Sequence, residues 1–454
     1  MSIIKLIISD LHLADGHPVL DGFGDYQQAA FEGLLHAAGT SGSLGQADDV
    51  ELIINGDCFD FLIIPPYETR GVTDPTTALG KLEKIIAAHT PFFRALSDFI
   101  KIPGRYVTVI TGNHDIELRF EEVRTRILQA MSVGEGAINF CPTRFYRPLP
   151  DVHIEHGNYF DFWNHHIQGI WDEQGQPLTL KPETITLPFG SLYYQAAGIL
   201  ISTQYPYFDH FEPSMNYTRQ VALLCLLNRS IVKEVASRTM ALLSEPRDAL
   251  IGLSPEEEHI PARLFEQAMI DFAAFEQDII ARKTDWHELP LKDHTQLAND
   301  PLTEFTMLRE ALSLPFVEAV TAVCTPTLYQ MGEAVAAGMH HVLQSDPTLR
   351  YALAGHTHMT RIDPINQGAQ VYLNTGSWTT RLAIPAPGEI TPALIDWLRQ
   401  PDWNAIPLRD RTQLLFALVN AKAERSATGE DELRSSASLC VWEGGTKGNY
   451  RVLA

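Results

Sequence analysis

The sequence predicts an α/β protein in which a layered β-sheet core is flanked by helices and interrupted by a large helical insertion. Three observations lead to this fold class. Short apolar runs rich in β-branched residues alternate with helical segments up to about residue 160, and similar runs return after residue 345. Between these parts the strand signals fade and long amphipathic segments replace them. Several of the apolar runs are followed within three residues by Asp, Asn or His.

The first part of the chain carries apolar runs typical of strands buried on both faces. These runs are Ile3–Ile8, Val50–Asn55, Arg105–Ile110 and the shorter Val152–Glu155. A helix is expected over Gln27–Ala38, and another over Leu79–Phe99 that Pro91 must kink or break. Strand–helix–strand alternation of this kind implies a largely parallel sheet.

The middle of the chain, residues 161–345, is expected to be mainly helical and to form a cap or a side domain. Apolar residues recur there at helical spacing in Tyr217–Leu243, Arg263–Arg282, Thr303–Leu312 and Tyr329–Leu343. Such stripes serve core packing more often than ligand binding. We therefore expect a core of residues 1–160 and 346–454 and an insertion of residues 161–345.

The strand signal resumes after the insertion. Arg350–Ala354 and Val371–Thr375 are strand-like, and Ser438–Glu443 with Tyr450–Leu453 predicts a closing hairpin. Charged and polar residues dominate Ala421–Ser436, which indicates either an exposed helix or a poorly ordered segment.

Composition and charge restrict the class of protein and of partner. The 454 residues include 34 basic and 56 acidic ones, and the formal charge of −22 argues against nucleic-acid binding. The five cysteines show no CxxC spacing, which favours a reducing compartment. No signal peptide is evident, and the longest apolar run is far shorter than the roughly 18 residues of a membrane span. We expect a cytoplasmic protein and leave its oligomeric state open.

Side chains suited to metal binding follow the predicted strands. They are Asp10, His12, Asp57, Asn113, His156, His356 and His358. The carboxyl ends of parallel strands are where open α/β sheets carry their chemistry. Oxygen and nitrogen ligands without thiolate suit Mn²⁺, Fe, Zn²⁺ or Co²⁺. Asp57 ends its strand where one carboxylate can bridge two ions.

His156 has competitors for the lone-histidine position. His153 lies three residues earlier, and His165 and His166 follow. We favour His156 because it stands at the end of a strand, and we expect His153 and His165 to be structural.

Two-metal hydrolysis is the chemistry that needs such a set. Ions roughly 3.5–4 Å apart hold a bridging hydroxide, stabilise charge on a phosphoryl group and align the leaving oxygen. The carboxylates of Asp10 and Asp57 against two divalent cations leave a charge of about +2 in the site. This local positive charge in an acidic protein favours small phosphoesters over polyanions.

The ordered motifs D-x-H, G-D, G-N-H-D, a lone His and G-H-x-H resemble the signature of the calcineurin-like metallophosphoesterase superfamily. The resemblance covers residues 1–160 and 346–454, and it implies an α/β/β/α sandwich with two divalent metal ions, Mn²⁺ foremost. It implies that Asp10, His12, Asp57 and His358 hold the first ion. The second ion is then held by Asp57, Asn113, His156 and His356.

The same resemblance assigns roles toward the substrate. His114 matches the family's non-ligand histidine, which contacts the substrate phosphate and protonates the leaving group, and Asn113 is expected beside it in substrate binding. Asp60 occupies the place of the carboxylate that orients this histidine, and Asp115 competes for that role. Arg361 closely follows a ligand-bearing strand and is a further candidate for substrate contact.

The implied activity is hydrolysis of a phosphodiester or phosphoanhydride by a metal-bridging hydroxide, with His114 as general acid. His156-Gly157 and Asn374–Trp378 resemble the bacterial UDP-diacylglucosamine pyrophosphohydrolase branch. That branch has Arg in place of His114, and His114 instead matches the phosphodiesterase and phosphatase branches. A phosphatase acting on monoesters is the alternative. A non-catalytic metal-binding scaffold is a more distant one, and the charge of −22 argues against a nuclease.

Overall fold

The computed structural model describes residues 2–453 except 40–43, 68–70, 162–163, 165–169, 173, 213–219, 221–222, 225, 245–317, 319, 322–323, 325–331, 426–430 and 445–447. The chain divides into two compact units. The first consists of Met1–Gln195, Gly332–Thr380 and Thr412–Ala454, and the second of Ala196–Met331 and Arg381–Arg411. These bounds differ from those expected, because residues 161–195 and 332–345 belong to the first unit and residues 381–411 to the second.

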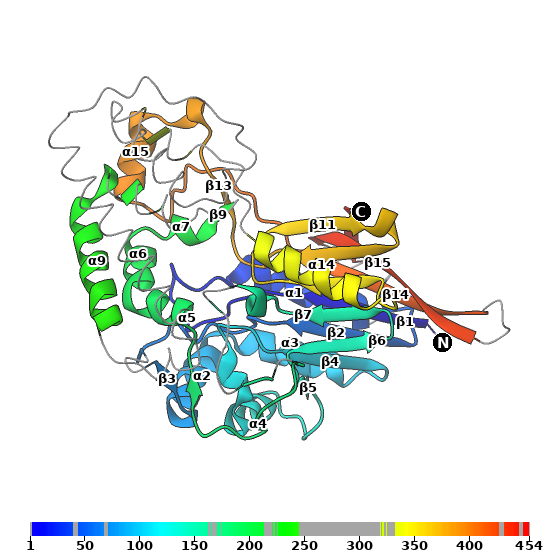
Figure 1. Cartoon of the computed structure of the whole chain (residues 1–454). Helices are drawn as coiled ribbons and strands as arrows, with labels where there is room; N and C mark the ends of the chain where they lie inside the picture. Colours follow the sequence, from blue (N-terminus) through cyan, green and yellow to red (C-terminus); the bar gives the residue numbers. More distant parts are fainter. Residues whose placement is uncertain are drawn as a thin grey trace. The chain divides into compact units, whose positions relative to one another are not determined.

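A seven-stranded sheet forms one layer of the first unit (Figure 1). Its parallel part consists of β1 (Ser2–Ile8), β2 (Asp49–Asn55), β4 (Arg105–Ile110) and β5 (Asn139–Phe140). Three antiparallel strands extend it beyond β1, namely β14 (Leu415–Arg425), β15 (Asp431–Gly444) and β16 (Asn449–Val452). The isoleucine-rich runs of β1 and β2 are almost wholly buried, as expected of strands that are covered on both faces.

A five-stranded sheet forms a second layer of the same unit. Its parallel centre consists of β7 (Val152–Glu155), β10 (Tyr351–Ala354) and β12 (Gln370–Thr375). The antiparallel strands β6 (Phe145–Leu149) and β11 (Thr360–Ile365) lie at its two edges. Residues separated by about 200 positions therefore become neighbours in β7 and β10.

The facing sides of the two sheets share one hydrophobic core. Ile7, Ile53 and Ile110 of the seven-stranded sheet belong to the same buried cluster as Ile154 and Leu353 of the five-stranded sheet. Successive strand residues point to opposite faces, so alternate residues of each strand face helices instead.

Helices cover the outer faces of both sheets. On the seven-stranded sheet these are α1 (Asp25–Gly39) and α3 (Thr90–Ile100). On the five-stranded sheet α14 (Glu333–Ser345) packs Met339 and Leu343 against Ala352. Helices α2 (Pro75–Ala88) and α4 (Glu121–Ala130) pack against each other in the same unit. Further short elements of this unit are β3 (Val72–Thr73), η1 (Ile116–Arg119), η2 (Asn158–Phe160), β8 (Ile185–Thr186), α5 (Phe189–Tyr193) and η5 (Asn366–Gly368).

The described part of the second unit is mainly helical. Its helices are α6 (Ile199–Gln204), α7 (Tyr207–His210), α9 (Arg229–Ser244) and α15 (Pro392–Arg399), and β9 (Phe211–Glu212) pairs with β13 (Leu382–Ala383). The Arg381 guanidinium donates hydrogen bonds to the carbonyls of Asp209 and Phe211 at 2.9 and 2.6 Å. The helices expected over Arg263–Arg282 and Thr303–Leu312 lie outside the described residues.

The mixed α/β class is confirmed, and so are the strands expected from the apolar runs. The break near Pro91 is confirmed as well, since α2 ends at Ala88 and α3 begins at Thr90 with Pro91 in its first turn. The expectation of a largely parallel sheet needs correction, because the strands divide between two mixed sheets.

The expectation for Ala421–Ser436 is wrong. The described residues of this segment continue β14 and β15, which pair with each other, and β14 also pairs with β1. Backbone hydrogen bonds to a distant strand stabilise a polar segment without any local apolar pattern to indicate it.

Candidate metal centre

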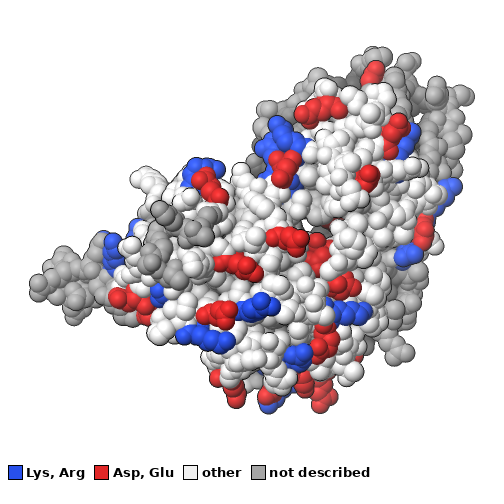
Figure 2. All heavy atoms as spheres, turned by 180° about the vertical axis from the view of Figure 1, so that it is seen from behind, with Lys and Arg blue, Asp and Glu red and all other residues white. Residues whose placement is uncertain are grey.

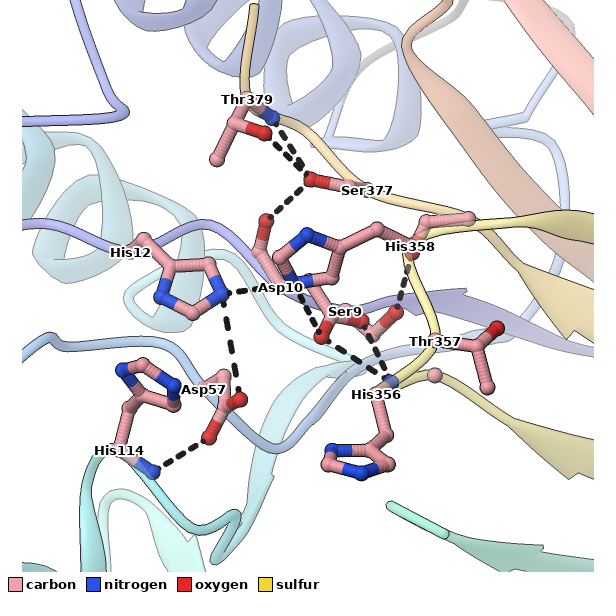
Figure 3. A network of polar contacts seen from close by, with 12 residues as sticks. Ser9, Asp10, His12, Asp57, His114, His356, Thr357, His358, Ser377 and Thr379 are labelled. Atoms are coloured by element: carbon pink, nitrogen blue, oxygen red, sulfur yellow. Dashed lines mark hydrogen bonds and ion pairs between the residues drawn. The ribbon is translucent and has the colours of Figure 1, made fainter. Parts of the chain in front are cut away.

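Loops that follow neighbouring parallel strands bring the predicted residues together. Strands β1, β2 and β4 are neighbours in one sheet, and β7 and β10 are neighbours in the other. Their carboxyl ends carry side chains whose ligand atoms lie within 4.8 Å of one another in three groups: Asp10, His12 and His358; Asp57, His156 and His356; His12, Asp60 and His114. The side chains of the first group point toward one another (Figure 3). All of these residues belong to the first unit.

Left-handed backbone conformations are concentrated in these loops. Asp10, His12, Asp57, His356 and His358 have φ angles of 55°, 52°, 50°, 67° and 56°. They are five of the eight non-glycine residues with positive φ in the described part of the chain. Such a conformation costs about 1–3 kcal/mol per residue and persists where the surroundings over-determine it, most often at functional sites.

In the first group, the nitrogens of two imidazoles face each other. His12 Nε2 lies 3.0 Å from His358 Nε2, which lies 3.3 Å from Asp10 Oδ1. The other ring nitrogen of His12, Nδ1, lies 3.1 Å from Asp60 Oδ2. Because Nδ1–H donates to that carboxylate, the lone pair of His12 is on Nε2 and points into the group. Ligand atoms about 2.0–2.2 Å from one ion lie at such mutual separations.

In the second group, a ring nitrogen and a carboxylate oxygen face each other across a similar gap. His156 Nδ1 donates to the Asn55 carbonyl at 2.9 Å, so the neutral ring has its lone pair on Nε2. That Nε2 lies 3.1 Å from Asp57 Oδ2 and has no hydrogen-bond partner among the described residues. The buried amide oxygen of Asn113 likewise has no partner there. A buried acceptor without a partner is costly, and a bound cation would satisfy it.

Asp57 lies between the two groups. Its Oδ2 is 3.1 Å from His156 Nε2 and 3.9 Å from His12 Nε2. Its Oδ1 accepts the backbone N–H of His114 at 2.8 Å (Figure 3). The carboxylate is 1% exposed, so it is desolvated and aimed at both groups.

His114 has a carboxylate partner, and the geometry distinguishes the two candidates for it. His114 Nδ1 lies 3.0 Å from Asp60 Oδ2, the oxygen that also contacts His12. Asp115 instead accepts backbone N–H groups, from Gly112 at 2.7 Å and from Cys58 at 2.8 Å. Of the two carboxylates, Asp60 is therefore the one that contacts the ring of His114, and Asp115 joins the loops that follow β2 and β4.

The ionisable groups of the site shift one another's protonation. Burial raises the pKa of the Asp57 carboxyl, but the imidazoles of His156 and His114 outweigh it and hold that pKa well below its usual range. Burial lowers the pKa of His156, but Asp57 and then Asp10 raise it to about 9. For His114, burial lowers the pKa while Asp60 and Asp57 raise it to about 10. In the metal-free protein, protons on imidazoles thus balance the buried carboxylates.

Two glycines of the motifs are required because side chains from other strands lie against their Cα atoms. A Cβ on Gly56, which has a φ of 80°, would collide with the ring of His156. A Cβ on Gly355 would collide with the Asp10 carboxylate. The glycines that precede Asp57 and His356 therefore make room for ligands contributed by other strands.

The segment Asn374–Trp378 donates hydrogen bonds to two of the loops that carry candidate ligands. The Asn374 amide donates to the Gly355 carbonyl at 2.8 Å. The Ser377 hydroxyl and the Trp378 backbone N–H donate to the Asp10 carbonyl at 3.2 and 3.1 Å. Trp378 is fully buried, so its indole packs in the core and holds the loops in place.

Two predicted candidates lie outside the cluster. His153 stacks on Phe145 and lies 3.3 Å from Glu155 Oε2, so it is a packed histidine as expected, whereas His165 lies outside the described residues. Arg361 pairs with Asp363 at 2.6 Å and with Glu333 at 2.9 Å, which neutralises its charge. Its contact with substrate stays a prediction.

One contact at the site has no counterpart among the sequence predictions. Asp161 Oδ2 lies 2.9 Å from His356 Nε2. Asp161 follows η2, the short turn after His156-Gly157, and stands at the first position of the expected insertion. No sequence signal distinguishes it from other acidic loop residues. The contact depends on pairing between β7 and β10.

Comparisons with known proteins assign no family. No protein-family model matches the chain, and the search of curated proteins finds no significant relative.

Two features of the molecule concern its surface and its helices. On the face drawn in Figure 2, Lys and Arg are interspersed with Asp and Glu among the described residues. The described residues of this face therefore form no extended basic stripe of the kind typical of nucleic-acid binding. Among the helices in the described part of the chain, none is both long and apolar enough to cross a membrane.

Proposed function

We propose that this protein is a dinuclear-metal-dependent phosphoesterase that hydrolyses a phosphodiester or a phosphoanhydride in a small substrate. The observation that carries this proposal is the position of Asp57 between two groups of ligand atoms, with the His114–Asp60 pair beside them. We further propose that the layered first unit is the sandwich of the calcineurin-like metallophosphoesterases, which would place the chain in that superfamily.

The donor set fits two divalent ions. Asp10, His12, His358 and one Asp57 oxygen would hold one of them. The other would be held by Asp57, Asn113, His156 and His356. Oxygen and nitrogen donors without thiolate favour Mn²⁺, with Fe, Zn²⁺ and Co²⁺ as alternatives. When bound, such a pair supplies Lewis-acid stabilisation of a phosphoryl oxygen and lowers the pKa of water.

The chain's own residues supply the remaining steps. His114 is 21% exposed in its side chain, so it reaches solvent where the phosphoryl group would lie. Asp60 holds His114 Nδ1, so the Nε2–H is the proton available to a leaving oxygen. Asn113 would contact the substrate from the same loop. The partly exposed imidazoles of His356 and His358 mark the open side of the site, while Asp10 and Asp57 form its buried side.

The direct test is hydrolysis by the purified full-length protein with added Mn²⁺. Bis-p-nitrophenyl phosphate and p-nitrophenyl phosphate are compared for the wild type, for His114→Ala and for His341→Ala, whose histidine is exposed on α14. We expect faster cleavage of the diester and wild-type rates in His341→Ala. His114→Ala should lose activity only in part, because p-nitrophenolate leaves readily without a proton. Preference for the monoester would favour the phosphatase alternative. Metal binding without turnover of any phosphoester would contradict the proposal.

A further inference from the structure

We propose that Asp161 is a positioning residue for the second ligand group, because its carboxylate holds His356 so that Nδ1 is the ligand atom. This inference rests on the proposed metal centre. It adds a residue from the loop after β7 that none of the motifs contains.

The Asp161 carboxylate is itself held in place. Its Oδ2 accepts a hydrogen bond from the Asn164 side-chain amide at 2.7 Å and lies 2.9 Å from His356 Nε2. The backbone N–H of Asp161 donates to the Asn158 carbonyl at 3.1 Å, which closes the turn of η2. The Asp161 side chain is 27% exposed and that of His356 is 10% exposed, so the contact is partly shielded from water. A carboxylate fixed in this way sets the ring orientation of the imidazole it accepts from.

The contact also determines the tautomer of His356. A carboxylate accepts and does not donate, so the proton of the neutral imidazole stays on Nε2 and the lone pair is on Nδ1. The neighbouring His156 has the opposite arrangement, since its Nδ1 is occupied by the Asn55 carbonyl and its Nε2 faces Asp57. The two rings lie 5.3 Å apart at an interplanar angle of 69°. Two adjacent imidazoles thus present different nitrogens to one ion.

Three groups orient imidazoles around the site, and they differ in whether they can be replaced without affecting other parts of the site. His12 Nδ1 meets the carboxylate of Asp60, and His156 Nδ1 meets a backbone carbonyl. The contact from Asp161 is a side-chain carboxylate that can be replaced without altering a ligand or the general acid. It therefore offers a selective way to weaken the second group alone.

The test compares Asp161→Ala and Asp161→Asn with the wild type and with Asp172→Asn, a matched control in an exposed turn of the same unit. Mn²⁺ is titrated into the metal-free full-length proteins, and bound ions are counted. We expect Asp161→Ala to weaken one of two ions by about 10–100-fold and to leave the other unchanged. Asp161→Asn keeps an acceptor oxygen, so its loss should be smaller, and Asp172→Asn should match the wild type.

A second readout separates positioning from simple structural support. Nitrogen-15 imidazole spectra of the metal-free wild type should show His356 protonated on Nε2. Asp161→Ala should lose that tautomer preference. The urea unfolding midpoint of Asp161→Ala should stay at the wild-type value. His356→Gln identifies the resonance. Two ions bound with wild-type affinity in Asp161→Ala, or an unchanged His356 tautomer, would overturn the inference. A wild-type protein that binds two ions without hydrolysing any phosphoester would contradict only the proposed function.

Discussion

The two ligand groups of the candidate centre are alike in composition and differ in what supports them. In the Asp10–His12–His358 group, His12 is held by Asp60, whose same oxygen also contacts His114. In the Asp57–His156–His356 group, His156 is held by a backbone carbonyl and His356 by Asp161. The first group therefore shares an orienting carboxylate with His114, the proposed general acid, whereas the second group contacts the backbone of His114 through Asp57. Changes to Asp57 should affect both groups, changes to Asp60 should affect the first group and the acid together, and changes to Asp161 should affect the second group alone.

The largest effect is expected from Asp57, which belongs to the second group and lies 3.9 Å from His12 of the first. Asp57→Asn removes the negative charge that lies between them, so at least one of two Mn²⁺ ions should be lost. Several kcal/mol of transition-state stabilisation would disappear with it, which corresponds to about a thousandfold or more in turnover. Elemental analysis after dialysis and diester hydrolysis measure the two effects. Asp98→Asn, at an exposed surface position, is the control. Two tightly bound ions in Asp57→Asn would remove this residue as the bridge.

Removing the general acid should separate chemistry from metal binding. His114→Ala should keep both ions. The ring of His114 contacts Asp60 through Nδ1, and His114 belongs to neither of the two ligand groups. Turnover should fall by about 10²–10⁴-fold on esters with poor leaving groups and much less on p-nitrophenyl esters. The measurement is kcat/KM across a series of leaving groups. An equal loss along the whole series would contradict the role of His114 as the acid.

Asp60→Asn should produce a smaller loss of activity, and it should affect both metal affinity and the leaving-group dependence of turnover. The weaker acceptor would release His12 and His114 together, so affinity for one ion should fall by about 10–100-fold and the leaving-group dependence should steepen. Mn²⁺ titration and the same ester series measure both. Asp115→Asn is the informative comparison, since Asp115 binds backbone N–H groups: it should lower the urea midpoint without changing the leaving-group dependence. Identical behaviour of the two variants would contradict the division of roles.

Metal affinity should also depend on pH. The pKa of His156 is raised to about 9 in the metal-free protein, so below that pH a proton must leave before Nε2 can bind a cation. Affinity should rise by about tenfold per pH unit for each displaced proton and level off above pH 9. Mn²⁺ titration between pH 6 and 8, with protons counted at each step, tests this. Uptake of protons when Mn²⁺ binds would contradict this prediction, which expects protons to be released.

The sequence predicted which side chains lie together better than it predicted how the strands around them pair. The ligand residues carry local motifs that follow apolar strands, so Asp10, Asp57 and His358 could be named without knowing how the strands pair. Division of the strands between two sheets, and the continuation of β14 and β15 through a polar segment, depend on long-range backbone pairing that leaves no local pattern.

The same limit explains what the sequence missed inside the site. Asp161 approaches His356 only because β7 and β10 are adjacent, so the residues beside Asp161 in the sequence give no sign of this contact. The choice between Asp60 and Asp115 was also left open by their spacing. It is decided by where each carboxylate points: one toward His114 Nδ1 and the other toward backbone N–H groups.

The central claim is that two ions share Asp57, and electron paramagnetic resonance of the Mn²⁺-loaded protein tests it most directly. The account predicts two Mn²⁺ per chain with the signal of a magnetically coupled pair, converted to an isolated-ion signal in Asp57→Asn. A wild-type protein that binds no Mn²⁺, or that binds two ions without magnetic coupling, would contradict it.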